Sequence, residues 1–401
     1  MAGKISKRAA SATPDTRAIA PARARVRAGL LGSTALIAVG LACTPANAQT
    51  TIASPAGGGT ITRVGGSSTT NDQTGAGGGI LISNVTQAAT TTVNGVTITN
   101  TTGAPQADAL RIQGTASLAS TGVSLIGVNT LTTTVNGGAA LYVQTSANMG
   151  IGITSSGSTF TGSYGINLQA PSGYVSFDAS NQSQSFVANG THIAGFNSVT
   201  GVNAGIQLGS STFTGFDTGI NSSNYYGSYV QMTGGSINAL VTGIRTDATG
   251  GRSNIESQAA IVAPTGIHST NTAGAQITTS GAGTINSTSN GVGTGIIATS
   301  SGGTAADPFT INVGAAIGNI TAFATGVNLS TTGSSANVIN LTTAAAITAT
   351  GRAIDVTAGV FGNTGTFDLG GNVTGATGVY TNVGNYAVNI AAGVVVTSTG
   401  N

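Results

Sequence analysis

The stretch Phe160-Thr-Gly-Ser-Tyr-Gly-Ile-Asn-Leu168 decides the fold, because it returns slightly altered as Phe213-Thr-Gly-Phe-Asp-Thr-Gly-Ile-Asn221. Its core, a small residue followed by Ile or Val, recurs at Gly205-Ile206, Gly243-Ile244, Gly266-Ile267, Gly295-Ile296, Gly326-Val327, Ala353-Ile354 and Gly378-Val379. From Gly219 onward, successive small residues are roughly 25 residues apart, and only the interval from Gly205 to Gly219 is much shorter. A loose period of this size is typical of stacked units, each too small to bury its own apolar face.

The residues that follow the small residue alternate between apolar and polar, as in Ile166-Asn167-Leu168 and Val327-Asn328-Leu329. This alternation places the first and third side chains on one face of a strand and the middle one on the other. After about residue 50, no apolar pattern keeps helical spacing over a long window. The sequence therefore predicts an all-β chain, a parallel β-helix or β-solenoid, for which we expect a right-handed turn.

The patterned region extends over residues 79–401, and at about 25 residues a turn it predicts about 13 coils. Residues 49–78 are the least patterned and are expected to be a lead-in or an atypical cap. The competing interpretation is an exported, disordered, low-complexity chain, since 63 residues are Gly and only 5% are charged. Disorder is usually accompanied by low mean hydropathy, whereas this chain has a mean hydropathy of +0.24.

Residues 1–48 have the features of a secretory signal peptide. They hold seven of the 12 Lys and Arg residues, followed by an uncharged apolar run over residues 29–42. The small-x-small pattern Ala46-Asn47-Ala48 then predicts cleavage between Ala48 and Gln49. The alternatives are an uncleaved anchor, for which this apolar run falls short of the ~20 residues that span a bilayer, and lipidation at Cys43, where Gly40 replaces the usual Leu.

Removal of the signal peptide changes the charge of the chain. The remainder keeps five basic and nine acidic residues, so its net charge is 5 − 9 = −4. It has no basic patch of the kind that binds nucleic acid, and no nucleic-acid partner is expected. The only cysteine, Cys43, is lost, so disulfide-rich secreted scaffolds are excluded.

The long basic signal ending Ala46-Asn-Ala-Gln49, followed by cysteine-free repeats of the Thr-Gly-Ile-Asn-Leu kind, resembles the passenger domains of Gram-negative autotransporters and related surface adhesins. The resemblance covers residues 1–401. It implies an exported protein of a Gram-negative bacterium, displayed at the outer membrane and cell surface or secreted. The implied role is structural or adhesive, without catalysis, with an extracellular glycan or protein as ligand.

The resemblance also implies an outer-membrane β-barrel as partner. A barrel would appear as about a dozen amphipathic strands of roughly ten residues with aromatic girdles, whereas residues 398–401 still read Ser-Thr-Gly-Asn. We therefore expect the barrel either in cis beyond residue 401 or in trans, as a separate protein.

A polysaccharide lyase or hydrolase on the same fold is the enzymatic alternative. Glycoside hydrolysis needs two carboxylates about 5 to 10 Å apart, and the best candidate group, Asp247, Glu256 and His268, falls within one repeat beside Arg245 and Arg252. We favour solvated turn residues for this group, since no catalytic signature surrounds it. With two His and no thiol after residue 48, no metal site and no cofactor are expected.

Two features suggest binding. Tyr225, Tyr226 and Tyr229 gather three of the eight tyrosines. One interpretation is a loop that projects from a coil and contacts a sugar or protein, and the other, which we favour, is a lid packed on the rod. The middle position of the repeat is expected to form one outward column, a mainly polar, mixed-charge stripe in which stacked Asn side chains make hydrogen-bonded ladders, and we interpret this column as structural rather than as a site. Its members would be Asn167, Gln207, Asn221, Arg245, His268, Ile297, Asn328, Asp355 and Tyr380.

Overall fold

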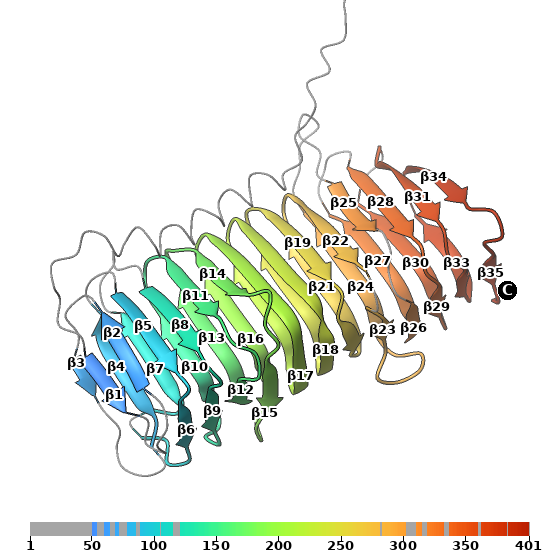
Figure 1. Cartoon of the computed structure of the whole chain (residues 1–401). Helices are drawn as coiled ribbons and strands as arrows, with labels where there is room; N and C mark the ends of the chain where they lie inside the picture. The colour runs from blue at the N-terminus through green and yellow to red at the C-terminus, as the bar shows by residue number, and fades with distance from the viewer. Residues whose placement is uncertain are drawn as a thin grey trace, which may run out of the picture. The chain divides into compact units, whose positions relative to one another are not determined.

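The computed structural model describes residues 50–400, except 54–59, 65–68, 72–77, 86–88, 105, 115–120, 281–282, 302–309, 315–318, 333–336, 360–361 and 383. This part of the chain is all β, and its strands form a solenoid of stacked parallel coils (Figure 1), which confirms the predicted fold class. It contains no helix long and apolar enough to cross a membrane. The signal peptide, with Ala46, Ala48 and Gln49, lies outside the described residues.

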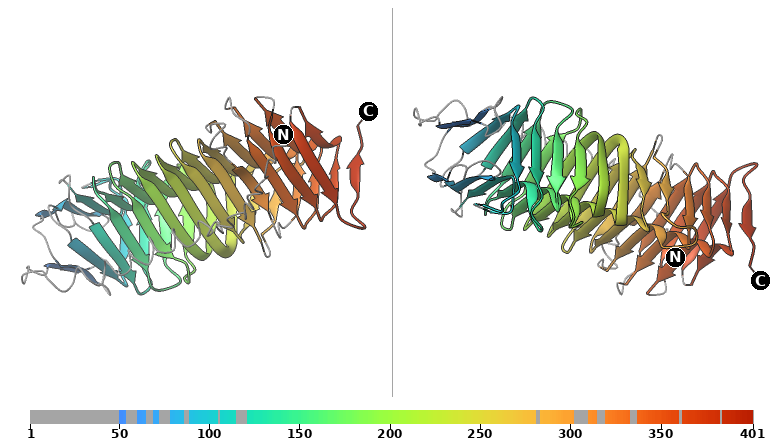
Figure 2. Two further views of the ribbon diagram at one scale, coloured as in Figure 1. Left: turned by 90° about the horizontal axis from the view of Figure 1, so that it is seen from above. Right: turned by 90° about the horizontal axis from the view of Figure 1, so that it is seen from below.

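Each turn has three strands, and each strand pairs in parallel with its equivalent one turn later, so that three faces extend along the solenoid (Figure 2). Face A consists of β4 (Ile80–Val85), β7 (Leu110–Gly114), β10 (Ala139–Gln144), β13 (Tyr164–Ala170), β16 (Ala194–Thr200), β21 (Thr265–Asn271), β24 (Thr294–Ser300), β27 (Thr325–Thr331), β30 (Arg352–Ala358) and β33 (Thr377–Thr381).

Face B follows face A along the chain. It consists of β5 (Ala89–Asn94), β8 (Thr121–Ile126), β11 (Met149–Ile153), β14 (Val175–Ala179), β19 (Arg252–Ser257), β22 (Gly274–Thr279), β25 (Thr310–Gly314), β28 (Val338–Thr343), β31 (Thr364–Leu369) and β34 (Asn385–Ile390).

Face C completes each turn. It consists of β6 (Thr97–Asn100), β9 (Thr130–Thr133), β12 (Thr159–Gly162), β15 (Ser185–Ala188), β20 (Ala260–Val262), β23 (Ile285–Asn286), β26 (Ile320–Phe323), β29 (Ile347–Ala349), β32 (Val373–Gly375) and β35 (Val396–Ser398). Two long strands, β17 (Asn203–Asn224) and β18 (Gly227–Ala248), bend through faces B, C and A in turn.

The solenoid has about 11 turns, so the estimate of about 13 was too high. The inward position of face A can be followed through its register partners from Ile80, turn by turn, to Val379. The error arose because several early turns, such as the one from Leu110 to Leu141, are longer than the assumed repeat of about 25 residues. These turns had no clear copy of the repeat to reveal their length.

The inside of the solenoid is filled by the inward residues of all three faces, which form one apolar cluster. In face C the rings of Phe160, Phe186 and Phe213 stack over three successive turns, with centroids 5.2 and 4.4 Å apart. Phe160 and Phe213, which begin the two clear copies of the repeat, are therefore equivalent positions two turns apart.

The small residue of the repeat stands where the chain enters face A. A methyl group added to Gly243 would overlap with Cγ2 of Ile261 and with the carbonyl oxygen of Gly266, one turn later. Gly219, Gly266, Gly295 and Gly326 meet equivalent neighbours. Most turns therefore keep Gly at this position because adjacent turns approach closely, and only the smallest side chain, the methyl of Ala109, Ala140 and Ala353, replaces it.

The two ends of the stack differ. At the first turn, β2 (Thr60–Val64) and β3 (Thr69–Asn71) pair antiparallel with β5 and β4, and β1 (Thr50–Ala53) pairs antiparallel with β2. These strands cover the hydrogen-bonding edge of the first coil. At the last turn, Val388 and Ile390 are 45% and 52% exposed, although their register partners Phe367 and Leu369 are buried.

Candidate functional site

The structure places most of the predicted outward residues in one column on face A, which we call the face-A column. It comprises, in order of turns, Leu81, Arg111, Tyr142, Asn167, Asn197, Asn221, Arg245, His268, Ile297, Asn328, Asp355 and Tyr380.

Gln207 does not belong to this column, and its assignment there was wrong. It pairs with Asp178 and Gln231 on face B. The local pattern Gly205-Ile206-Gln207 imitates the face-A motif, but it stands at the start of β17, where the chain still follows face B. The short interval from Gly205 to Gly219 is therefore the number of residues between face B and face A of one turn, and not the length of a full turn.

A ladder of amides occupies the middle of the face-A column. Asn197 Nδ2 donates a 2.9 Å hydrogen bond to Oδ1 of Asn167, and Asn221 Nδ2 donates one of 2.7 Å to Oδ1 of Asn197. Gln169 Nε2 also donates to Asn167 Oδ1, at 2.7 Å. Asn167 is 8% exposed and Asn197 is 7% exposed. These hydrogen bonds tie three turns together and satisfy amides that the stacking has withdrawn from water.

Further along the column the side chains become charged. Arg245 Nε lies 2.8 Å from Oδ2 of Asp247, and His268 is the register partner of Arg245 one turn later. Burial and, secondarily, the charge of Arg245 lower the pKa of His268, and Asp247 opposes them. His268 is therefore held mainly in its neutral form near pH 7.

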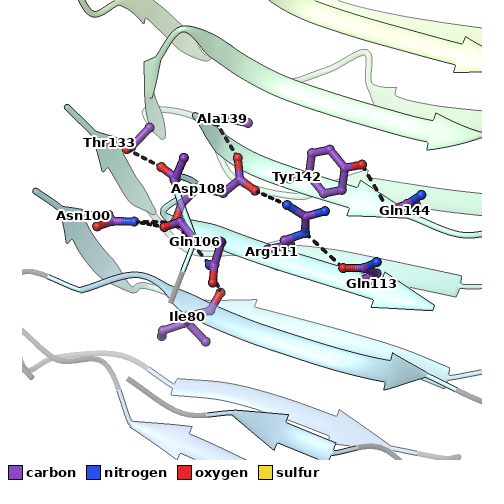
Figure 3. A network of polar contacts seen from close by, with 11 residues as sticks. Ile80, Asn100, Gln106, Asp108, Arg111, Gln113, Thr133, Ala139, Tyr142 and Gln144 are labelled. Atoms are coloured by element: carbon purple, nitrogen blue, oxygen red, sulfur yellow. Dashed lines mark hydrogen bonds and ion pairs between the residues drawn. The ribbon is translucent and has the colours of Figure 1, made fainter. Parts of the chain in front are cut away.

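An acid-base-aromatic arrangement occurs near each end of the column. Near its start, Arg111 lies 3.3 Å from Asp108 and 4.2 Å above the ring of Tyr142 (Figure 3). Near its end, Arg352 lies 3.0 Å from Asp355, and its guanidinium lies 3.7 Å from the ring centroid of Tyr380. In both places a guanidinium pairs with a carboxylate of its own turn and contacts an aromatic ring of the next turn.

The network around Asp108 has a structural explanation (Figure 3). Asp108 is 4% exposed, its Oδ1 accepts a 2.7 Å hydrogen bond from the backbone N–H of Ala139, and burial raises its pKa despite this bond and Arg111. Asn100 Nδ2 donates to the carbonyl oxygen of Asp108, and Gln106 Nε2 donates to that of Ile80. These contacts satisfy backbone groups where the chain enters β4, β7 and β10, and so support coil stacking.

Tyr225 and Tyr226 form an exposed corner between faces A and B. They are the two residues between β17 and β18 and both are exposed, so they form neither a projecting loop nor a lid packed on the rod. Their side chains are 51% and 56% exposed, and the two rings meet edge to face with centroids 4.7 Å apart. One turn later the corner consists of Thr249, Gly250 and Gly251, and the two glycines carry no side chains that would cover the rings. We call this feature the tyrosine corner.

Tyr229 lies beside this corner on face B, half-buried and outward. Its hydroxyl donates a 3.3 Å hydrogen bond to Oε2 of Glu256, which also accepts one of 3.1 Å from Gln231 Nε2. Gln207 Nε2 in turn donates to Gln231 Oε1 at 3.2 Å. The tyrosine corner is therefore flanked by a connected row of phenol, carboxylate and amide groups, which can donate to and accept from the hydroxyls of a ligand.

The structure places the three residues of the candidate catalytic group on two different faces. Asp247 and His268 lie on face A, whereas Glu256 lies on face B. On face B, Asp178 is three turns from Glu256, or about 14 Å at strand spacing. That separation exceeds the upper limit of about 10 Å for glycosidase carboxylate pairs. Among the described residues, no three His, Cys, Asp or Glu side chains gather into a group that could hold a metal ion.

Comparisons with models of protein families, with curated proteins and with solved structures found no match to the chain. Its function is therefore inferred from the fold and from the site.

Sequence reasoning missed Gln231 and Glu256 as neighbours of the tyrosines, although Gln207 was already singled out. The signal was the alternation Tyr229-Val-Gln231 and Asn254-Ile-Glu256, which has the same period of two as the repeat. It also missed that Ser222, Thr246 and Ser269 point inward. The same position is also polar at Ser198 and Thr381, and it is apolar from Ile82 to Leu168 and from Ala298 to Val356. Thr246 Oγ1 donates to Ser269 Oγ at 3.1 Å.

Proposed function

We propose that this chain is an exported, cell-surface β-solenoid of the autotransporter-passenger or adhesin kind, which binds an extracellular glycan at the tyrosine corner and catalyses no reaction. The observation that carries the proposal is the exposure of Tyr225 and Tyr226 on a rigid stack, directly beside the hydrogen-bonded row of Tyr229, Gln231 and Glu256.

The chemistry of the corner favours a sugar. An aromatic ring offers a flat apolar surface at small entropic cost, and carboxylate and amide groups nearby can bind hydroxyls. Arg252, which begins β19 and is exposed, places one positive charge at this corner, opposite in sign to Glu256. Mixed polar groups of this kind suit a neutral or weakly charged glycan better than a strongly charged polymer.

Export and surface display rest on the signal peptide and on the resemblance to autotransporter passengers. The proposed partner is an outer-membrane β-barrel, supplied in cis beyond residue 401 or in trans. We expect the exported protein to begin at Gln49, as determined by N-terminal sequencing, and to be digested by protease added to intact cells. An N-terminus at Met1, or protection from external protease, would contradict this part of the proposal.

Binding is tested on a glycan array with the purified protein. The double variant Tyr225→Ala/Tyr226→Ala is expected to lose the glycan signal while keeping its circular dichroism spectrum and melting temperature. The matched control is Leu240→Ala/Val241→Ala, which removes two side chains that are 49% and 52% exposed at another corner. Equal loss in both variants would contradict a site at the tyrosine corner. Cleavage of the bound glycan would contradict the absence of catalysis.

A further inference from the structure

Face C carries a regular array of hydroxyl groups over its first six turns. In β6, β9, β12, β15 and the face-C parts of β17 and β18, the two outward positions lie on either side of one buried apolar residue. Ten of these twelve positions are Thr or Ser, and Val187 and Asn238 are the exceptions. The pairs are Thr97/Thr99, Thr130/Thr132, Thr159/Thr161, Ser185/Val187, Thr212/Thr214 and Ser236/Asn238.

The array has two regular spacings. Neighbouring turns are about 4.8 Å apart, and residues i and i+2 of one strand are about 6.6 Å apart. Because Thr130, Thr159 and Thr212 hold the same register position, as do Thr132 and Thr161, the hydroxyls and methyls fall on a rectangular lattice. Both spacings are close to repeats of the water oxygens in hexagonal ice.

The backing of this lattice is rigid. The residues between the outward pairs point inward, and three of them are the stacked rings of Phe160, Phe186 and Phe213. β-branched Thr side chains have restricted χ1 angles, so the orientation of each hydroxyl and methyl is limited. A face of this kind keeps its spacing without the entropic cost of ordering long side chains.

The hydroxyls of the array are available to a ligand. Six of them make no hydrogen bond to another group of the described residues: those of Thr130, Thr132, Thr159, Thr161, Thr212 and Thr214. They are not shielded, since Thr212 and Thr214 are exposed and the other four are partly exposed.

The charge of face C indicates what it binds. Its own strands and the face-C parts of β17 and β18 contain no Asp, Glu, Lys, Arg or His, whereas the charged residues of the described turns lie on faces A and B and at the corners. A neutral surface of hydroxyls and methyls is complementary to a neutral, ordered water lattice and offers nothing to a charged polymer. Large apolar side chains of the kind that anchor a protein partner are absent from the twelve positions, apart from Val187.

We propose that this part of face C is an ice-binding surface, which holds water in the arrangement of ice through its Thr hydroxyls and methyls. This activity is independent of glycan binding, because face C is separated from the tyrosine corner between faces A and B. At the cell surface it would attach the protein to ice or restrain the growth of ice crystals.

The test is thermal hysteresis, the gap between the melting and freezing points of an ice crystal, together with inhibition of ice recrystallisation, measured on the purified protein. The unmodified protein is expected to shape the crystal and to produce a gap that grows with protein concentration. Thr161→Tyr places a bulky side chain in the middle of the lattice and is expected to remove most of the gap. Thr161→Val keeps the shape and loses one hydroxyl, and is expected to cause a smaller loss.

The matched control is Ser124→Tyr, an outward residue in β8 of face B, one turn before β12. It is expected to leave the gap unchanged. Circular dichroism and melting temperatures establish that each variant remains folded. Absence of ice shaping by the folded, unmodified protein would overturn the proposal, and so would an equal loss of activity in Ser124→Tyr and Thr161→Tyr.

Discussion

The side-chain amide of Asn197 donates a 2.9 Å hydrogen bond to Asn167, 30 residues earlier in the chain and one turn away in the solenoid. Because Asn221 donates in the same way to Asn197, the amide of Asn197 serves both neighbouring turns. Both Asn167 and Asn197 are almost fully buried, so the ladder stabilises the stack only as long as it is complete.

Asn197→Ala is expected to lower the free energy of unfolding by about 1–3 kcal/mol, since it removes the hydrogen bonds to both neighbouring turns and leaves the amide of half-buried Asn221 without this acceptor. The measurement is chemical denaturation followed by circular dichroism. Asn328→Ala, in the same column but half-exposed, is the control and is expected to change little. Equal effects of the two substitutions would show that the ladder contributes nothing specific.

Gly243→Ala tests the close approach of adjacent turns. The added methyl would overlap with Ile261 and with the backbone of Gly266, so one turn must shift, and we expect a loss of roughly 1–3 kcal/mol. Gly152→Ala is the matched control, because a methyl there has no heavy atom within 4 Å. It is expected to be neutral or slightly stabilising, through reduced freedom of the unfolded chain. A neutral Gly243→Ala would contradict the packing described for the repeat.

Phe186→Ala tests the aromatic stack, which joins three turns through face C. Removing the middle ring leaves a cavity between Phe160 and Phe213, with an expected cost of about 3–5 kcal/mol. Phe186→Leu keeps most of the volume and is expected to cost less. If the two variants melt at the same temperature, the ring stack is not what fills this part of the core.

The neutral state of His268 predicts a pH dependence of stability. Burial and Arg245 lower its pKa in the folded protein below the ordinary value of 6.5. As the pH falls through 6.5, the unfolded chain takes up a proton before the folded one does, so the free energy of unfolding decreases. His268→Gln is expected to lose less stability than the unmodified protein between about pH 7.5 and about pH 5.5. Parallel stability curves for the two proteins would contradict this assignment.

The sequence patterns predicted face A well and the other faces poorly. Gly-Ile-Asn-Leu and its variants mark face A because close approach admits only Gly or Ala and the inward position takes a large apolar residue, in most turns Ile or Val. Faces B and C have no such steric requirement at a fixed point, so their strands vary in length and composition. This explains why the second half of the chain gave a nearly regular period and why the early, longer turns led to too many coils.

The residues of the candidate site lie on different turns and become neighbours only when the coils are stacked. Tyr225, Tyr226 and Tyr229 were visible as a cluster in the sequence, but Gln231 and Glu256 are 25 residues apart and meet only through the register of β18 and β19. The same holds for the Thr lattice of face C, where pairs such as Thr130/Thr132 become a surface only when turns are aligned. To predict which residues of two successive turns are register partners, one needs the length of every segment between them. A short motif does not give that length.

The alignment of turns is therefore the central claim, and a pair of cysteines tests it most directly. Thr299 and Ser330 are register partners on face A, and their hydroxyls lie 2.8 Å apart. With Cys43 replaced by Ser, the variant Thr299→Cys/Ser330→Cys is expected to form an intramolecular disulfide under mild oxidation, because adjacent strands bring Cα atoms within disulfide range. Thr299→Cys/Thr357→Cys, two turns apart, is expected to stay reduced. A disulfide in the second protein, or its absence from the first, would contradict the stacking described here.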